Sequence, residues 1–176
     1  NASDGDGRGW LGRFADEFCS SPSEPLGVVS VGVGRRRDFE STVTAPLILS
    51  SVAGFQVDVD TRYRNDHQLR VETVRETLDS DPEPPSEPAI TIFGANKQAH
   101  ELVDRVKEGT AGWVDPGTYP THNIGQYMKT ISQLLHGHGQ FGTKVFYTGY
   151  GGFDTHSGQI ARQELLMQRL DEAVTA

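Results

Sequence analysis

The fold is decided by the segment Leu26–Val33, which reads LGVVSVGV and is almost continuously apolar. This run, bounded by Pro25 and Gly34, is too short for a typical helix, and its valines favour extended backbone. Apolar residues at consecutive positions indicate burial on both faces, as in the strands of a parallel sheet. A second β-rich run follows at Lys144–Tyr150. We therefore expect both runs to be strands of a mainly parallel sheet.

Helical periodicity surrounds these strands. The clearest apolar stripe predicts a helix over 123–136; its members are Ile124, Tyr127, Met128, Ile131, Leu134 and Leu135. Further helices are expected at about 9–20, 62–78 (capped by Asp60 or Thr61), from Ile90 or Phe93 to 108 (ended by Gly109) and 158–174. Residues 35–51 are expected to be irregular, 55–59 a short strand or loop, and 113–121 a loop. The alternation of helix and strand predicts an α/β fold.

The apolar stripes assign positions to the core as well. Val71, Val74 and Leu78 are expected to face inward from the second helix, and Leu166, Leu170 and Val174 from the last. Residues 79–88 are rich in proline and acidic side chains and predict a loop. We expect this loop to be an excursion within a single α/β domain that spans residues 1–176.

Composition narrows the possible partners. The chain has 176 residues and a net charge of −8, which argues against a general nucleic-acid binder because such proteins need a basic field. No apolar run approaches the roughly 20 residues of a membrane-spanning helix. Cys19 is the single cysteine. It follows Phe18 on the apolar side of a predicted helix, which favours a buried, inert thiol.

Both ends of the sequence are typical of an internal segment. The chain starts at Asn1 with small polar residues and shows no signal peptide. The last predicted helix reaches Ala176 without a capping glycine. We therefore expect a segment of a longer protein.

The segment Gly151–Gln159 concentrates the side chains best suited to chemistry. It follows the second strand, and ligands of α/β proteins bind beyond the carboxyl ends of their strands. Asp154 offers a carboxylate and His156 an imidazole, so the two could ligate a divalent cation or transfer protons. The alternative is that Asp154 or Ser157 caps the last helix while His156 packs on a neighbour.

Three other motifs invite a functional interpretation. The run Arg35–Arg37 could hold a phosphate or sulfate, or else form a solvated loop with ion pairs to Asp38 and Glu40. His136 and His138 could form a metal clamp but are expected to be structural, roughly 20 Å from Asp154. The turn Gly32-Val33-Gly34 resembles a dinucleotide-binding turn, although it lacks a third glycine and an adjoining helix.

Several segments together resemble the bacterial domain of unknown function number fifteen-oh-one, a group of exported, sulfatase-like proteins related to the alkaline phosphatase superfamily. The resemblance rests on Gly9–Arg13 (GWLGR), Tyr119-Pro120, Leu134-Leu135, Lys144–Tyr147, Gly152–His156 (GFDTH), Gln159, Leu165-Leu166 and Leu170. It spans nearly the whole chain and is strongest from Tyr119 onward, where the string GFDTH is the most specific part.

The resemblance implies an incomplete three-layer α/β/α sandwich of the alkaline phosphatase type. It places Asp154 and His156, as catalytic and metal-binding residues, in a site for a divalent metal ion and a small anionic sulfate or phosphate ester. Arg13, Arg35 and Arg36 are the candidate anion-binding residues. Family members carry further motifs on both sides of the matched part, so we expect the remainder of the polypeptide to complete the fold and this segment to be inactive alone.

The resemblance also implies an exported or periplasmic location. Two other classes stay open at this stage. One is a non-catalytic exported binding or scaffold module with the same fold. The other is a nucleotide-binding domain, which rests on Gly32 and Gly34 alone.

Overall fold

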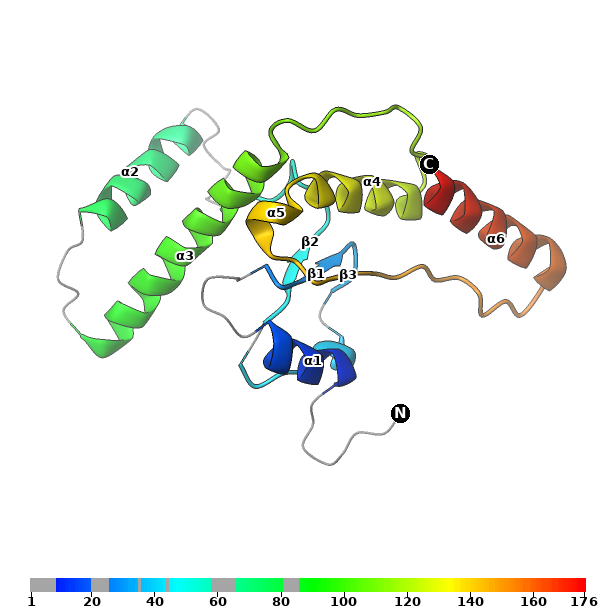
Figure 1. Cartoon of the computed structure of the whole chain (residues 1–176), viewed down its shortest axis with the longest axis horizontal. Coiled ribbons are helices and arrows are strands. Elements are labelled where there is room, and N and C mark those ends of the chain that lie inside the picture. Colours follow the sequence, from blue (N-terminus) through cyan, green and yellow to red (C-terminus); the bar gives the residue numbers. More distant parts are fainter. Residues whose placement is uncertain (1–8, 20–25, 35, 44, 58–65, 81–85) are drawn as a thin grey trace.

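The structure is a computed structural model that describes residues 9–19, 26–34, 36–43, 45–57, 66–80 and 86–176. Its elements in chain order are α1 (Trp10–Phe18), β1 (Val28–Val31), the 3-10 helix η1 (Arg37–Phe39), β2 (Leu47–Leu49), α2 (His67–Asp79), α3 (Glu87–Thr110), α4 (Asn123–His136), α5 (His138–Phe141), β3 (Val145–Thr148) and α6 (Gln159–Thr175). Figure 1 shows this arrangement.

The three described strands form one parallel sheet in the order β2-β1-β3. The central strand pairs in register with both neighbours, so that Val29 lies opposite Leu47 on one side and Phe146 on the other. All four residues of β1 are buried, as the continuous apolar run predicts. Every residue of the edge strand β3 is half-buried. The predicted α/β class with a parallel sheet is confirmed.

Helices cover both faces of the sheet. On one face, Leu11, Ala15 and Cys19 of the α1 region pack with Phe39 of η1 against Val28. On the other face, buried side chains of α3, α4 and α5 meet those of β1 and β2, with Val106, Leu134 and Phe141 among them. The result is a three-layer α/β/α arrangement, compatible with the sandwich that the resemblance implies. Cys19 is buried, as predicted.

Two helices form an arm at the side of the sandwich. The carboxyl-terminal half of α3 lies on the core, while its amino-terminal half projects from the sheet and carries α2 alongside (Figure 1). On α2, Leu78 is buried and Val71 is partly buried, but Val74 is 39 % exposed, contrary to the predicted stripe. The predicted caps Asp60 and Thr61 lie outside the described residues.

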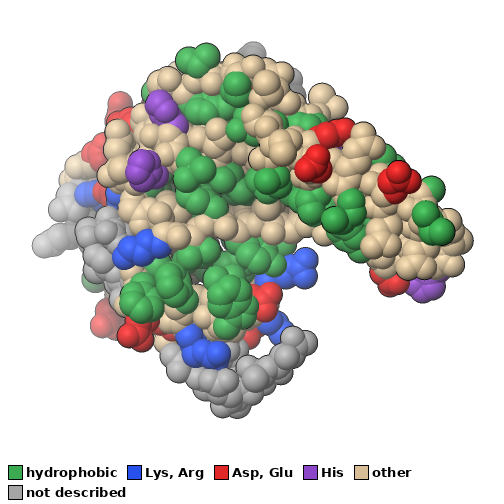
Figure 2. All heavy atoms as spheres, turned by 45° about the vertical axis from the view of Figure 1, so that its right-hand side comes forward, with side chains coloured by type: hydrophobic (Ala, Val, Ile, Leu, Met, Phe, Trp, Pro, Cys, Tyr) green, Lys and Arg blue, Asp and Glu red, His purple; other side chains and the backbone are tan. Residues whose placement is uncertain are grey.

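The last helix, α6, packs on α4 and projects on the opposite side of the molecule (Figure 1). Leu166 is buried and Leu170 is partly buried, as predicted. The prediction for Val174 is wrong: this side chain is 65 % exposed, and Ala173 is buried in its place. Close contact with α4 favours the smaller residue there. Figure 2 shows hydrophobic side chains across the face of the body and at the base of the projecting segment.

Three predicted boundaries need correction. Residues 35–51 contain η1 and the strand β2, so they are not simply irregular. The helix expected from residue 90 begins at Glu87, with Pro88 in its first turn, where a missing N–H costs no helical hydrogen bond. Gly109 lies inside this helix, and a Cβ there would come within 2.3 Å of the Phe141 ring. Close packing therefore explains this glycine better than helix termination.

The remaining segments agree better with expectation. The predicted loop at 113–121 is observed, and in it the Gly117 amide donates to the Asp115 carboxylate over 2.9 Å. Residues 55–57 are not a strand, and 58–59 lie outside the described residues. Within the described part of the chain, we find no helix long and apolar enough to cross a membrane.

Candidate functional site

The loop at 149–158 connects β3 to α6 and leaves the sheet at the carboxyl end of the strand. This is the edge where ligands bind in parallel α/β sheets. The loop runs outward along the projecting α6 segment rather than back over the sheet (Figure 1). Asp154 and His156 are therefore presented on an outlying segment, with solvent on most sides.

The two predicted ligands do lie together. Asp154 Oδ1 and His156 Nδ1 are 3.6 Å apart, and the side chains are 93 % and 86 % exposed. An ion pair this exposed contributes little to stability, because water screens the attraction and both side chains lose rotamer freedom to form it. The pairing brings both groups within reach of one ligand.

The alternative interpretation of this loop, as a helix cap, is wrong. The N-cap of α6 is Gly158, which has left-handed backbone (φ 61°) and provides no side-chain cap. Neither Asp154 nor Ser157 occupies that position. His156 does not pack on a neighbour, since most of its side chain faces solvent. Asp154 and Ser157 therefore do not cap α6, and His156 does not pack against a neighbour.

The geometry of the pair suits two ligands of one metal ion. Ligand oxygens and nitrogens lie at about 2.1 Å from zinc, so two of them in a tetrahedral site are roughly 3.4 Å apart. The observed separation of 3.6 Å is close to that value. Two ligands do not make a stable site, however, and the described residues contain no group of three His, Cys, Asp or Glu side chains that could hold a metal.

The three candidate anion-binding arginines have different positions. Arg36 is exposed, and its Nη2 lies 3.9 Å from the point where a Cβ on Gly149 would sit, so it reaches the start of the Asp154 loop. Arg13 lies on α1 with a partly buried side chain, in the layer that α1 and η1 form. Arg35 lies outside the described residues. Arg36 is therefore a described arginine that the fold brings beside the loop.

Sequence reasoning missed two hydroxyl groups in the same loop. The hydroxyls of Tyr150 and Thr155 are buried, and neither has a hydrogen-bond partner among the described residues. The Tyr150 ring packs edge-on against Phe153, with ring centroids 5.7 Å apart. Buried polar groups almost always have a partner, so unsatisfied hydroxyls beside candidate ligands are notable. Their positions four residues before and one residue after Asp154 were the available signal.

The other motifs do not join this site. His138 Nδ1 lies 3.0 Å from the Leu135 carbonyl oxygen at the end of α4, next to the amino end of β3 and not its carboxyl end. The Gly32 turn has φ 71°, and a Cβ there would lie 2.2 Å from the Tyr127 ring. Since an aromatic ring occupies the approach to this turn, the space that a dinucleotide phosphate needs is filled.

The histidine that precedes α4 caps this helix and lies beside α6. His122 is the N-cap of α4, and its Nδ1 accepts from the Gly125 amide over 3.3 Å. Its Nε2 lies 3.6 Å from the Glu172 carboxylate of α6. This histidine therefore links the two helices next to the C-terminal end of α6, which gives it a structural role.

Comparison of the chain with protein-family models, with curated proteins and with solved structures gives no match.

Proposed function

We propose that this chain contributes part of a metal-dependent site for the hydrolysis of sulfate or phosphate esters, with Asp154 and His156 as two of the metal ligands. The observation that carries the proposal is the 3.6 Å separation of their ligand atoms at the carboxyl end of a parallel strand. Both side chains are exposed, so further ligands could approach them. Those ligands would come from the remainder of the polypeptide.

The residues have separate roles in this proposal. A bound divalent ion would polarise the ester oxygen and stabilise the charge that develops on it. Asp154 supplies a negative oxygen ligand, and His156 supplies a neutral nitrogen ligand. Arg36, beside Gly149, neutralises the sulfate or phosphate group, with Arg35 and Arg13 as the other candidates. From the family resemblance we also propose that the protein is exported or periplasmic and that the segment alone is inactive.

The test is metal binding, measured by calorimetry with Zn²⁺, Mn²⁺ and Mg²⁺ on the longest polypeptide that contains this sequence. Asp154→Ala and His156→Ala should each weaken binding of the preferred ion by tenfold or more, since loss of even an outer-shell partner has an effect of this size. His136→Ala removes an exposed imidazole elsewhere and serves as the matched control. Unchanged affinity in both loop variants would sink the assignment.

One observation favours the second candidate, a non-catalytic exported binding or scaffold module. The pair is almost fully exposed, and the described residues provide no third ligand. A module of this kind would keep the parallel sheet without the chemistry. The flanking sequence of the gene discriminates between the candidates: further Asp and His motifs support the hydrolase, and their absence supports the module.

A further inference from the structure

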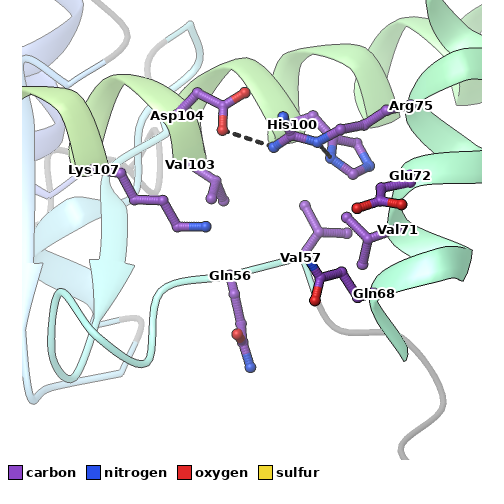
Figure 3. A pocket seen from close by; sticks show the side chains of 10 residues that line it. All are labelled: Gln56, Val57, Gln68, Val71, Glu72, Arg75, His100, Val103, Asp104 and Lys107. Atoms are coloured by element: carbon purple, nitrogen blue, oxygen red, sulfur yellow. Dashed lines mark hydrogen bonds and ion pairs between the residues drawn. The ribbon is translucent and has the colours of Figure 1, made fainter. Parts of the chain in front are cut away.

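The arm formed by α2 and α3 contains a cleft that the proposed hydrolase site does not use. Its volume is about 410 Å³, within the range of small-molecule sites. The two helices and the segment at 56–57 form its walls, as Figure 3 shows. It lies on the opposite side of the molecule from the Asp154 loop (Figure 1). Any ligand here therefore binds independently of that loop.

A buried histidine lines this cleft. His100 is 5 % exposed, and its Nδ1 accepts a hydrogen bond from Arg75 Nε over 3.3 Å. Because an accepting Nδ1 carries no proton, Nε2 carries the proton of the neutral ring. Nε2 is itself buried and has no partner among the described residues. The His100 ring lines the cleft and thus carries a buried N–H donor that has no acceptor among the described residues.

The neighbouring polar groups do not satisfy this donor. Arg75 reaches from α2 to Asp104 on α3, with Nη2 2.7 Å from Oδ1, so the Asp104 carboxylate is already engaged (Figure 3). Burial lowers the pKa of His100, and the charge of Arg75 adds to the effect. The ring is therefore neutral near pH 7 and offers one N–H. Leaving such a donor unsatisfied is unfavourable, and a ligand oxygen that accepts from it would remove that penalty.

The remaining walls define the rest of the ligand. Val71 and Val103 supply apolar surface from the two facing helices, which suits a short aliphatic chain. Lys107 projects toward the cleft from α3, with an exposed side chain (Figure 3). Glu72 stands on the α2 wall and is also exposed, so its repulsion of an anion is screened by solvent. An acceptor with negative charge fits the buried donor and the lysine together.

We propose that the cleft between α2 and α3 binds a small aliphatic carboxylate, whose charge faces Lys107 and whose chain lies on Val71 and Val103, and whose oxygen accepts from His100 Nε2–H after a movement of the ring opens this buried atom to the cleft. A metal ion is a poorer fit, because the described residues bring no three ligand side chains together. A water molecule would satisfy the donor but would leave most of the volume and the valine surface unused.

The test uses three probes of similar shape on the whole chain: pentanoate, pentanamide and pentylamine. Calorimetry should find pentanoate binding tightest, pentanamide weaker, and pentylamine not binding. In ¹⁵N NMR spectra of the histidine side chains, pentanoate should shift the Nε2 resonance of His100. No binding of pentanoate at millimolar concentration overturns the proposal, and so does pentanamide or pentylamine binding as tightly as pentanoate.

Variants assign the binding to the cleft. His100→Leu should weaken pentanoate binding by tenfold or more, the effect of losing a hydrogen bond to a charged group. Lys107→Met should weaken it by about two- to threefold, as expected for an exposed charge. Lys97→Met changes an exposed lysine on the same helix outside the cleft and should have no effect. The lysine variants alter surface positions, so they test the proposal even where His100→Leu perturbs folding.

The assignment is overturned if pentanoate binds with the same affinity to the unmodified chain, Lys107→Met, Lys97→Met and His100→Leu. That result would place the carboxylate outside the cleft. A loss in Lys97→Met as large as that in Lys107→Met would do the same, because it would show a non-specific charge effect.

Discussion

Two histidine-bearing regions of this molecule, the Asp154 loop and the α2–α3 cleft, differ in how far the protein encloses their side chains. At the Asp154 loop, an imidazole and a carboxylate are 86 % and 93 % exposed, so both are surrounded mainly by solvent. At the α2–α3 cleft, His100 is 5 % exposed and bound by Arg75, so its proton affinity is set by the fold. The Asp154 loop carries a motif that the sequence reveals, whereas the His100 cleft is enclosed by the tertiary structure. A sequence motif and an enclosed polar side chain are thus independent indications of a binding site.

The largest expected effect on stability tests the contact through which α3 packs on the core at Gly109. Gly109→Ala adds a methyl group within 2.3 Å of the buried Phe141 ring and should lower the free energy of unfolding by about 1–3 kcal/mol. Urea denaturation measures this change. Gly94→Ala is the matched control on the same helix, with nothing near the added methyl, and should raise stability by up to about 1 kcal/mol. Equal effects at both glycines would show that α3 does not rely on this contact.

The second effect concerns pH. Burial and the charge of Arg75 lower the pKa of His100, and the charges of Asp104 and Asp79 raise it by less. His100 therefore binds a proton more readily in the unfolded chain than in the folded one. This contribution to stability is present above about pH 6.5, the ordinary pKa of histidine, and is lost as the pH falls toward the lowered pKa. The difference in urea midpoint between pH 7 and pH 5 should be smaller in His100→Leu than in the unmodified chain.

Lys97→Met provides the baseline for that comparison, since it changes a charge on the same helix away from His100. If His100→Leu and the unmodified chain lose the same stability on acidification, then His100 does not hold its neutral form in the folded state.

A third, smaller effect compares the two charge pairs directly. Arg75 and Asp104 are 2.7 Å apart with side chains 35 % and 40 % exposed, so a double-mutant cycle should give a coupling energy of up to about 1 kcal/mol. The more exposed pair Asp154 and His156 should give no measurable coupling. If the coupling energy of Asp154 and His156 equals that of Arg75 and Asp104, then burial does not determine the strength of these two pairs.

The smallest effect is expected at the candidate metal ligands themselves. Asp154→Ala and His156→Ala should each change the free energy of unfolding by less than about 0.5 kcal/mol, as is usual for exposed sites without structural contacts. Thermal or urea unfolding in the presence of a chelator measures this. A larger loss in either variant would indicate a structural role for the loop and would weaken its assignment to a site.

The sequence predicts those elements whose pattern is complete within a short window. The helix at Asn123–His136 has the predicted bounds because three turns of apolar spacing define it. The strand β1 follows from consecutive valines. By contrast, β2 has only three residues after Pro46, and nothing local distinguishes them from a loop. Its identity depends on pairing with β1, a contact that a local pattern does not contain.

The candidate sites divide in the same way. Asp154 and His156 are recognisable because they are two residues apart and follow a strand. The cleft was missed because its residues come from two helices and from the segment at 56–57. A partial signal was available: His100 shares helical spacing with Val103 on the buried face of α3, where a polar residue is unusual. Pairing with Arg75, 25 residues earlier, is a property of the tertiary structure.

The central position of β1 has a consequence for synthesis. Its backbone is joined to β3 by a contact in which the Thr148 hydroxyl donates to the Val31 carbonyl, 117 residues away in the chain. A ribosome adds about 5–20 residues per second, so β1 waits roughly 6–23 s for this partner. During that interval one edge of a strongly apolar strand is open to other chains. Slowing translation between the two strands should therefore increase aggregation, and early formation of the α1 layer over β1 should reduce it.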